Sequence, residues 1–197
     1  MHPLLNQPLF LIKEHIGIFK AANNFDIFNP ETGEMIMTCR EEKLGFFTKM
    51  FRFTKYKIMT PFHVEIKSLS GDPILSITRN SSFLGFAPVN VLDEKGNLVG
   101  TMKRKFRLGG AKLELNDAMG QLVCTLKGNF IGWDFKITKD EQEWANITKK
   151  WAGIGQEFFT SADNYILEMN HLVPKDDQAR MLMLGAVLCI DFLLKEN

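Results

Sequence analysis

Apolar and polar residues alternate along most of this chain, and each alternating stretch continues through a turn into another. Phe62, Val64 and Ile66, for example, are separated by single polar residues. Alternation with a period of two is typical of a β-strand that buries one face. Gly and Asx residues between the stretches supply the positive φ angles and local hydrogen bonds of hairpin turns. The pattern therefore predicts five β-hairpins, with turns at 29–33, 70–73, 93–96, 116–120 and about 139–143.

Two further strands are expected outside these hairpins. The stretch PLFLIKEHIGIF precedes the first hairpin, and NYILEMN follows the last one. About twelve antiparallel strands in one chain of this length are expected to close into a barrel, because closure removes exposed strand edges. The lumen of such a barrel is too wide for the side chains of its own strands to fill. No linker rich in Pro, Gly or Ser interrupts the chain, so we expect residues 1–197 to form a single domain.

The C-terminal stretch ARMLMLGAVLCIDFLLKEN predicts the missing core element. Its apolar run, 181–194, would form a helix about 21 Å long. A bilayer core is about 30 Å thick and needs about 20 apolar residues, so a membrane span is the less favoured alternative. Asp191 interrupts the run, which is otherwise apolar on every face, as is typical of a helix in a protein core. We therefore predict a mainly β fold, a closed antiparallel barrel around a central hydrophobic helix at about 175–195. The helix residues expected to be buried are Met181, Leu184, Gly185, Leu188, Ile190 and Phe192.

The composition is that of a globular protein, with 45% hydrophobic residues, 24% charged residues and a net charge of +1. This balance shows no bias towards nucleic acid or acidic partners. Three distant cysteines without a CxxC pair predict neither a zinc site nor a disulfide framework, and they fit a reducing compartment. The N-terminal stretch lacks the basic residues and the cleavage site of a secretory signal. We therefore expect a cytoplasmic location.

The sequence also lacks the common catalytic motifs. Its four histidines show no metal-ligand spacing, and neither a GxSxG elbow nor a P-loop occurs. The glycines of GIGQEF, Gly153 and Gly155, precede an aromatic strand and not the helix of a dinucleotide-binding turn. We expect a protein that is not an enzyme and that has no cofactor.

One strip, residues 44–62, interleaves basic and aromatic side chains. Basic side chains near anionic lipid contribute about 1 kcal/mol each, and aromatic rings favour the membrane interface. The strip therefore predicts a site for anionic phospholipid or a membrane surface. Two alternatives stay open, a strand with one packed face and a stacking surface for single-stranded nucleic acid, which the net charge disfavours. The candidate membrane-binding residues are Lys49, Arg52, Lys55, Lys57, Phe51 and Phe53. A second basic run, 103–107, has strand spacing and is interpreted as a solvated barrel face.

Two stretches near the C-terminus, ITKKWAGIGQEFFTSADNY and LGAVLCIDFLLKE, carry a set of spaced motifs. The first has Lys-Trp-x-Gly, an acid before an aromatic, and Thr-x-Ala-Asp. The second has Gly-Ala, then Ile-Asp-Phe, then Glu. The residues concerned are Lys150, Trp151, Gly153, Glu157, Thr160, Ala162, Asp163, Gly185, Ala186, Ile190, Asp191, Phe192 and Glu196. This pattern resembles the end of the phospholipid scramblase family, and NPETGE upstream resembles it more loosely.

The resemblance implies a fold and a function. The family belongs with the tubby C-terminal and LURP-one-related proteins, whose twelve strands close around a central hydrophobic helix. Its members are described as moving phospholipids between leaflets without ATP in a calcium-dependent way. The family's calcium segment opens Asp-Ala-Asp, but Ser161 replaces the first acid here and only Asp163 is kept. Calcium takes six to eight oxygen ligands, so we do not expect a calcium site at Asp163. The clustered cysteines that would carry lipid anchors are also missing.

Two hypotheses about function follow. The first is a scramblase-like protein that contacts phospholipid at the cytoplasmic face of a membrane and assists its transbilayer movement. The second is a soluble tubby-like module that binds a phosphoinositide, a peptide or a protein partner and transports nothing. A helix that fills the lumen favours the second hypothesis, because it leaves no route for a lipid, whereas the family resemblance favours the first.

Overall fold

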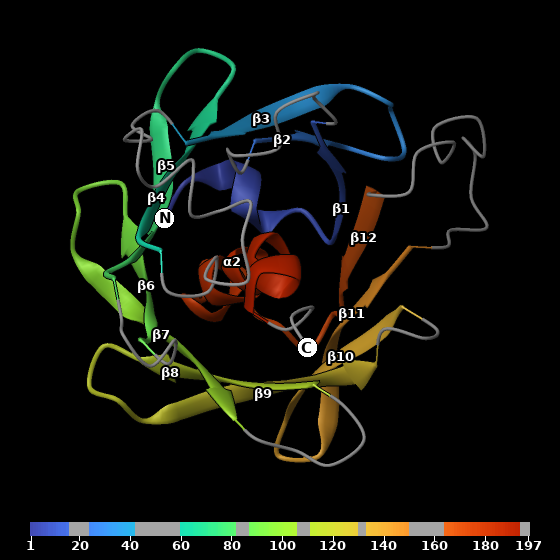
Figure 1. Cartoon of the computed structure of the whole chain (residues 1–197). Coiled ribbons are helices and arrows are strands. Elements are labelled where there is room, and N and C mark those ends of the chain that lie inside the picture. Colours follow the sequence, from blue (N-terminus) through green and yellow to red (C-terminus); the bar gives the residue numbers. More distant parts are fainter. Residues whose placement is uncertain are drawn as a thin grey trace.

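The computed structural model describes residues 1–15, 24–41, 60–81, 87–105, 111–129, 133–149 and 164–193. Within these ranges, twelve strands form a closed barrel with a helix at its centre (Figure 1). The strands are β1 (Leu9–Glu14), β2 (Phe25–Phe28), β3 (Met35–Arg40), β4 (Phe62–Ser68), β5 (Pro73–Arg79), β6 (Val89–Asp93), β7 (Leu98–Lys105), β8 (Ala111–Asp117), β9 (Leu122–Asn129), β10 (Asp134–Lys139), β11 (Gln142–Thr148) and β12 (Asn164–Met169). The helices are the 3-10 helix η1 (Pro3–Asn6) and the central α2 (Ala179–Leu193).

The topology is a simple antiparallel ring. Each strand pairs with its neighbours in the sequence, and β1 closes the barrel by pairing with β12. The predicted hairpins are β2–β3, β4–β5, β6–β7, β8–β9 and β10–β11, and the two flanking stretches contain β1 and β12. The predicted fold class, barrel closure and strand number are therefore confirmed.

The antiparallel order makes the two ends of the barrel different. The five tight hairpins lie at one end, together with η1, which leads into β1. We call this the hairpin end. The connections that leave β1, β3, β5, β7, β9 and β11 all lie at the opposite end, which we call the connection end. The basic and aromatic strip joins β3 to β4, so both of its attachments are at the connection end.

The hairpin turns use the residue types that the sequence analysis identified. Asp93 Oδ1 accepts hydrogen bonds from the backbone N–H groups of Lys95 and Asn97, at 2.9 and 2.8 Å. Gly96 in the same turn has a φ of 81°, where a side chain would be strained. The β8–β9 turn repeats this arrangement with Asp117 as the acceptor, although the sequence pattern had placed the start of the turn one residue earlier.

The turn between β10 and β11 offers a test of local strain. Asp140 and Glu141 have φ angles of 48° and 64°, typical of a two-residue type I′ turn that prefers Asn-Gly. We expect Glu141→Gly to raise the free energy of unfolding by about 0.5–1 kcal/mol, because a left-handed non-Gly residue costs roughly 1–2 kcal/mol. Urea denaturation measures the change. Glu141→Ala is the control, since it keeps the Cβ and gives no such gain. A Gly variant no more stable than the Ala variant would contradict the prediction.

Helix α2 fills the lumen of the barrel (Figure 1). Every residue from Ala179 to Ile190 is buried, and none of the apolar side chains among them is more than 6% exposed. A Cβ built on Gly185 would lie 3.3 Å from Val91 Cγ2, so the helix touches the barrel wall closely there. Five of the six helix residues predicted to be buried have buried side chains or backbone in the structure, and the side chain of Phe192 lies outside the described part. No helix in the described ranges has the length and apolar character needed to cross a bilayer.

The start of α2 is held by contacts that the sequence did not reveal. The helix begins at Ala179 and not near 175, because Asp176 has a φ of 59° and the Asp177 carboxylate accepts a hydrogen bond from Ala179 N. The side chain of Arg180, which is only 4% exposed, donates to backbone carbonyls in the segment before β1 and in the segment after β12. Its acceptors are Leu5 O, Gln7 O, Val173 O and Pro174 O, at 2.8–3.1 Å. Arg180 therefore ties the core helix to the N-terminal segment.

Candidate functional site

The sequence-predicted binding residues lie outside the described part of the chain. They are Lys49, Phe51, Arg52, Phe53, Lys55 and Lys57 within 42–59, and Asp163 within 150–163. The membrane-binding strip therefore stays a prediction. So does the expected lack of a calcium site at Asp163. Within the described ranges, no group of three His, Cys, Asp or Glu side chains is placed to hold a metal ion.

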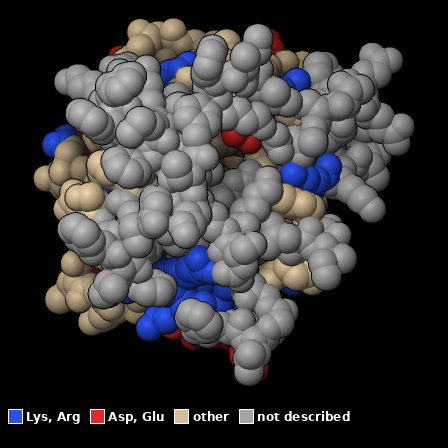
Figure 2. Space-filling model, in the orientation of Figure 1, with Lys and Arg blue, Asp and Glu red and all other residues tan. Residues whose placement is uncertain are grey.

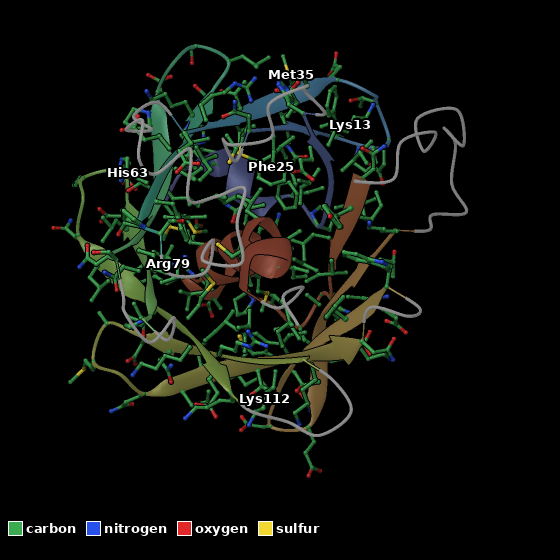
Figure 3. The ribbon with its side chains drawn as sticks, viewed as in Figure 1. Lys13, Phe25, Met35, His63, Arg79 and Lys112 are labelled. Carbon is green, nitrogen blue, oxygen red and sulfur yellow. The ribbon has the colours of Figure 1, made fainter. Side chains whose placement is uncertain are left out.

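The strip attaches to the barrel through a buried polar region. Glu41, which precedes the strip, and Thr60, near its end, are 7% and 5% exposed, and Arg79 on β5 is 2% exposed. Arg79, labelled in Figure 3, donates from Nη2 to Thr60 O at 2.8 Å, and its guanidinium lies 5.2 Å from the ring centroid of Phe62. A buried guanidinium requires such partners because it loses its hydration. These contacts fix the position at which the chain returns from the strip into β4.

The three cysteines do not form a reactive centre. Cys39, Cys124 and Cys189 are free and buried. Burial raises the pKa of Cys124 and of Cys189 to about 12, and it raises the pKa of Cys39 well above its usual range. The thiolate, and not the thiol, is the nucleophile, so these side chains are poor nucleophiles at neutral pH.

The second basic run lies at the end of β7. Lys103 and Lys105 are exposed and Arg104 between them is half-buried, while Arg107 lies outside the described residues. Lys105 Nζ is 3.2 Å from a carboxylate oxygen of Glu114 on β8, and Lys112 Nζ is equally close to the other oxygen. These lysines lower the pKa of Glu114 although burial acts in the opposite direction. Figure 2 shows Lys and Arg side chains gathered over the β7–β9 part of the barrel. Lys103 and Lys105 are thus on a solvated face, as the sequence indicated, whereas Arg104 lies opposite the buried Leu113 on the inner face of the strand.

A cationic and aromatic cluster at the connection end was not identified from the sequence. Trp133, just before β10, packs against the ring of Tyr165 on β12 at 5.5 Å between centroids. Lys149 Nζ lies 3.5 Å from the centroid of the Trp133 ring and 5.1 Å from that of Tyr165. The three residues are far apart in the sequence, so no local motif marks the cluster. The only signal in the sequence is the presence of two aromatic residues and a lysine near the ends of the predicted strands.

The chain is similar to known proteins over most of its length. The model of the scramblase family matches residues 10–197, which include all twelve strands of the barrel except the first residue of β1, and also α2. A Saccharomyces cerevisiae protein named altered inheritance rate of mitochondria protein 25 is 24% identical over 197 residues, covering 85% of this chain and 60% of that protein. A phospholipid scramblase family protein of Schizosaccharomyces pombe is 18% identical over 179 residues, covering 84% of this chain and 47% of that protein.

The chain thus spans about half to three fifths of the length of these two relatives. No solved structure matches it. The family match extends over the barrel and its central helix, so it agrees with the C-terminal motifs and with the observed fold. The chain therefore belongs to the scramblase family.

Proposed function

We propose that this protein works at the cytoplasmic face of a membrane, where it contacts anionic phospholipid and assists lipid movement between leaflets. Family membership supports phospholipid as its partner. The main structural observation behind the proposal is that α2 fills the lumen with buried residues from Ala179 to Ile190. Lipid contacts therefore belong on the outside of the barrel.

The filled lumen also limits the mechanism. A phospholipid headgroup that crosses a bilayer needs polar partners, because burying a charged group without them is costly. The lumen instead holds apolar helix residues such as Leu184 and Ile190, both 0% exposed. Any help that this domain gives to transbilayer movement thus comes from its outer surface, by binding headgroups or disturbing the interface, and not from a path through the barrel.

A second candidate is a tubby-like binding module that holds a phosphoinositide, a peptide or a protein partner without transport. The same filled lumen favours it, since an outer binding surface is sufficient for such a role. Neither candidate is an enzyme with a cysteine nucleophile, because burial keeps all three thiols protonated at neutral pH.

Two assays on the full chain separate these functions. Co-sedimentation with phosphatidylserine-containing vesicles, compared with pure phosphatidylcholine vesicles, tests for anionic lipid binding. A leaflet-exchange assay with a fluorescent phospholipid and an external quencher then tests for transport. We expect binding to the anionic vesicles alone, followed by accelerated exchange. Binding without exchange would favour the binding module, and equal sedimentation with both vesicles would contradict a role on anionic membranes.

A further inference from the structure

The strand register places four lysines in one continuous row across the outer wall. Lys105 on β7 lies directly opposite Lys112 on β8. Lys112 lies opposite Lys127 on β9, and Lys127 lies opposite Lys136 on β10. We call these four residues the lysine row. Strands are about 4.8 Å apart, so the row extends over about 14 Å.

All four side chains of the lysine row point away from the lumen. The neighbours of Lys112, Lys127 and Lys136 in the sequence, Leu113, Leu126, Phe135 and Ile137, are 0% exposed, and side chains alternate between the two faces of a strand. Lys105 lies directly opposite Lys112 and so shares its face. Lys105, Lys127 and Lys136 are exposed and Lys112 is half-buried. The row is therefore a solvated feature of the barrel surface (Figure 2).

Carboxylates neutralise the lysine row only in part. Glu114 lies 3.2 Å from both Lys105 and Lys112, and Glu143 lies 2.7 Å from Lys136. Within the described ranges, Lys127 has no carboxylate partner, although it faces a lysine on each side. Like charges placed directly opposite on neighbouring strands destabilise a sheet. Three such pairs in succession suggest a surface that matches an external anion and not one arranged for stability.

The row lies at the same end of the barrel as the two attachments of the predicted strip, although on the opposite wall (Figure 1). Lys105 ends β7 and Lys112 is the second residue of β8, so this part of the row is at the connection end. The strip leaves β3 and returns at β4 at that same end.

We propose that the lysine row is a docking surface for anionic phospholipid at a membrane. The proposal rests on the proposed function and names a surface for it. A row of cations on a convex sheet fits a plane of anionic headgroups, to which each basic side chain adds attraction. Single-stranded nucleic acid is the weaker match, because it is held by stacking on aromatic rings. The described outward-facing residues next to the row include Lys103, Glu114, Thr125, Asn129, Asp134, Thr138 and Asn146, none of which is aromatic.

The first test removes the charge of the row in the full chain. We expect Lys105, Lys112, Lys127 and Lys136, all changed to Gln, to weaken binding to phosphatidylserine-containing vesicles on the order of 100-fold at low salt. The matched control changes Lys67, Lys95, Lys139 and Lys175 to Gln, which removes the same charge from the hairpin end. The control should lose less affinity, because its charges lie towards the other end of the barrel. The nearest, Lys139, is three residues along β10 from Lys136, about 10 Å or one Debye length at 0.1 M salt.

The second test is a gain of binding, which misfolding cannot produce. Glu114→Gln frees Lys105 and Lys112 from their shared carboxylate, so vesicle binding should tighten by about fivefold. Glu31→Gln, in the exposed β2–β3 turn, makes the same charge change at the hairpin end and should have a smaller effect. Thermal melting adds a third readout. Lys127→Gln should leave the melting temperature unchanged or raise it by about 1–3 °C, since it relieves two like-charge pairs.

The vesicle and oligonucleotide results separate failure of the lysine row from failure of the proposed function. If the row variant and the hairpin-end control bind equally, the lysine row is not the docking surface, although the proposed function survives. If the parent binds anionic vesicles no better than neutral ones, the proposed function and the lysine row both fail. If the row variant loses affinity for a single-stranded oligonucleotide but keeps its vesicle binding, the surface serves nucleic acid, and the lipid assignment is overturned.

Discussion

Removal of the chain from Ala179 onwards is expected to unfold the barrel. Helix α2 places a continuous run of buried apolar side chains at the centre of the barrel core, and each fully buried apolar side chain stabilises the fold by about 1.5–3 kcal/mol. The net stability of a domain is only about 5–15 kcal/mol, so an empty lumen cannot be tolerated. Near-ultraviolet circular dichroism and size-exclusion chromatography of the truncated chain measure the result. A truncated protein that stays folded and merely leaves the membrane fraction would instead support a membrane-anchoring helix.

A single substitution in α2 measures how much one buried side chain of the helix contributes to stability. Leu184→Ala opens a cavity in the centre of the lumen, where Leu184 is 0% exposed, and should lower the free energy of unfolding by about 2–5 kcal/mol. Met119→Ala is the control, because Met119 is 85% exposed in the β8–β9 turn and should change stability by less than about 0.5 kcal/mol. Similar losses for the two variants would show that α2 does not form the core.

Replacing Lys49, Arg52, Lys55 and Lys57 with Ser is expected to remove up to about 4 kcal/mol of attraction to anionic lipid, roughly a thousandfold in affinity. The contact is electrostatic, so binding by the parent should weaken as the Debye length falls from about 10 Å at 0.1 M salt to about 3 Å at 1 M. The fold should survive, because solvated charges contribute little to stability. Vesicle co-sedimentation over a salt series, with thermal melting alongside, measures both quantities.

The control for this variant changes Lys67, Lys95, Lys139 and Lys175 to Ser, which gives the same net charge at the hairpin end. If the strip variant sediments with anionic vesicles as well as the parent does, the strip is ordinary barrel wall. The lysine row would then be the remaining candidate for lipid contact. If neither surface contributes, the non-membrane binding module becomes the leading function.

Much of this fold was readable from the sequence because the relevant forces are local. The alternation of Phe62, Val64 and Ile66 assigns one face of β4 to the core, whatever the rest of the chain does. Gly96 and Asp93 make a turn through their own conformational freedom and hydrogen bonds. The all-round apolar character of α2 required burial, and a barrel of twelve strands offered the only large lumen. Strand number, closure and the central helix followed.

Contacts between distant residues were decided only by the tertiary structure. Arg180 fixes the start of the core helix by donating to Leu5 O, across 175 positions of the chain. The four lysines of the row are separated by irregular spacings in the sequence, and only the register of β7 to β10 aligns them. The register of neighbouring strands depends on which long-range pairings bury the most apolar surface, so it cannot be predicted from a local sequence pattern. The sequence by itself determined a barrel with a buried helix, whereas the surface on which its charges gather was set by how the strands align.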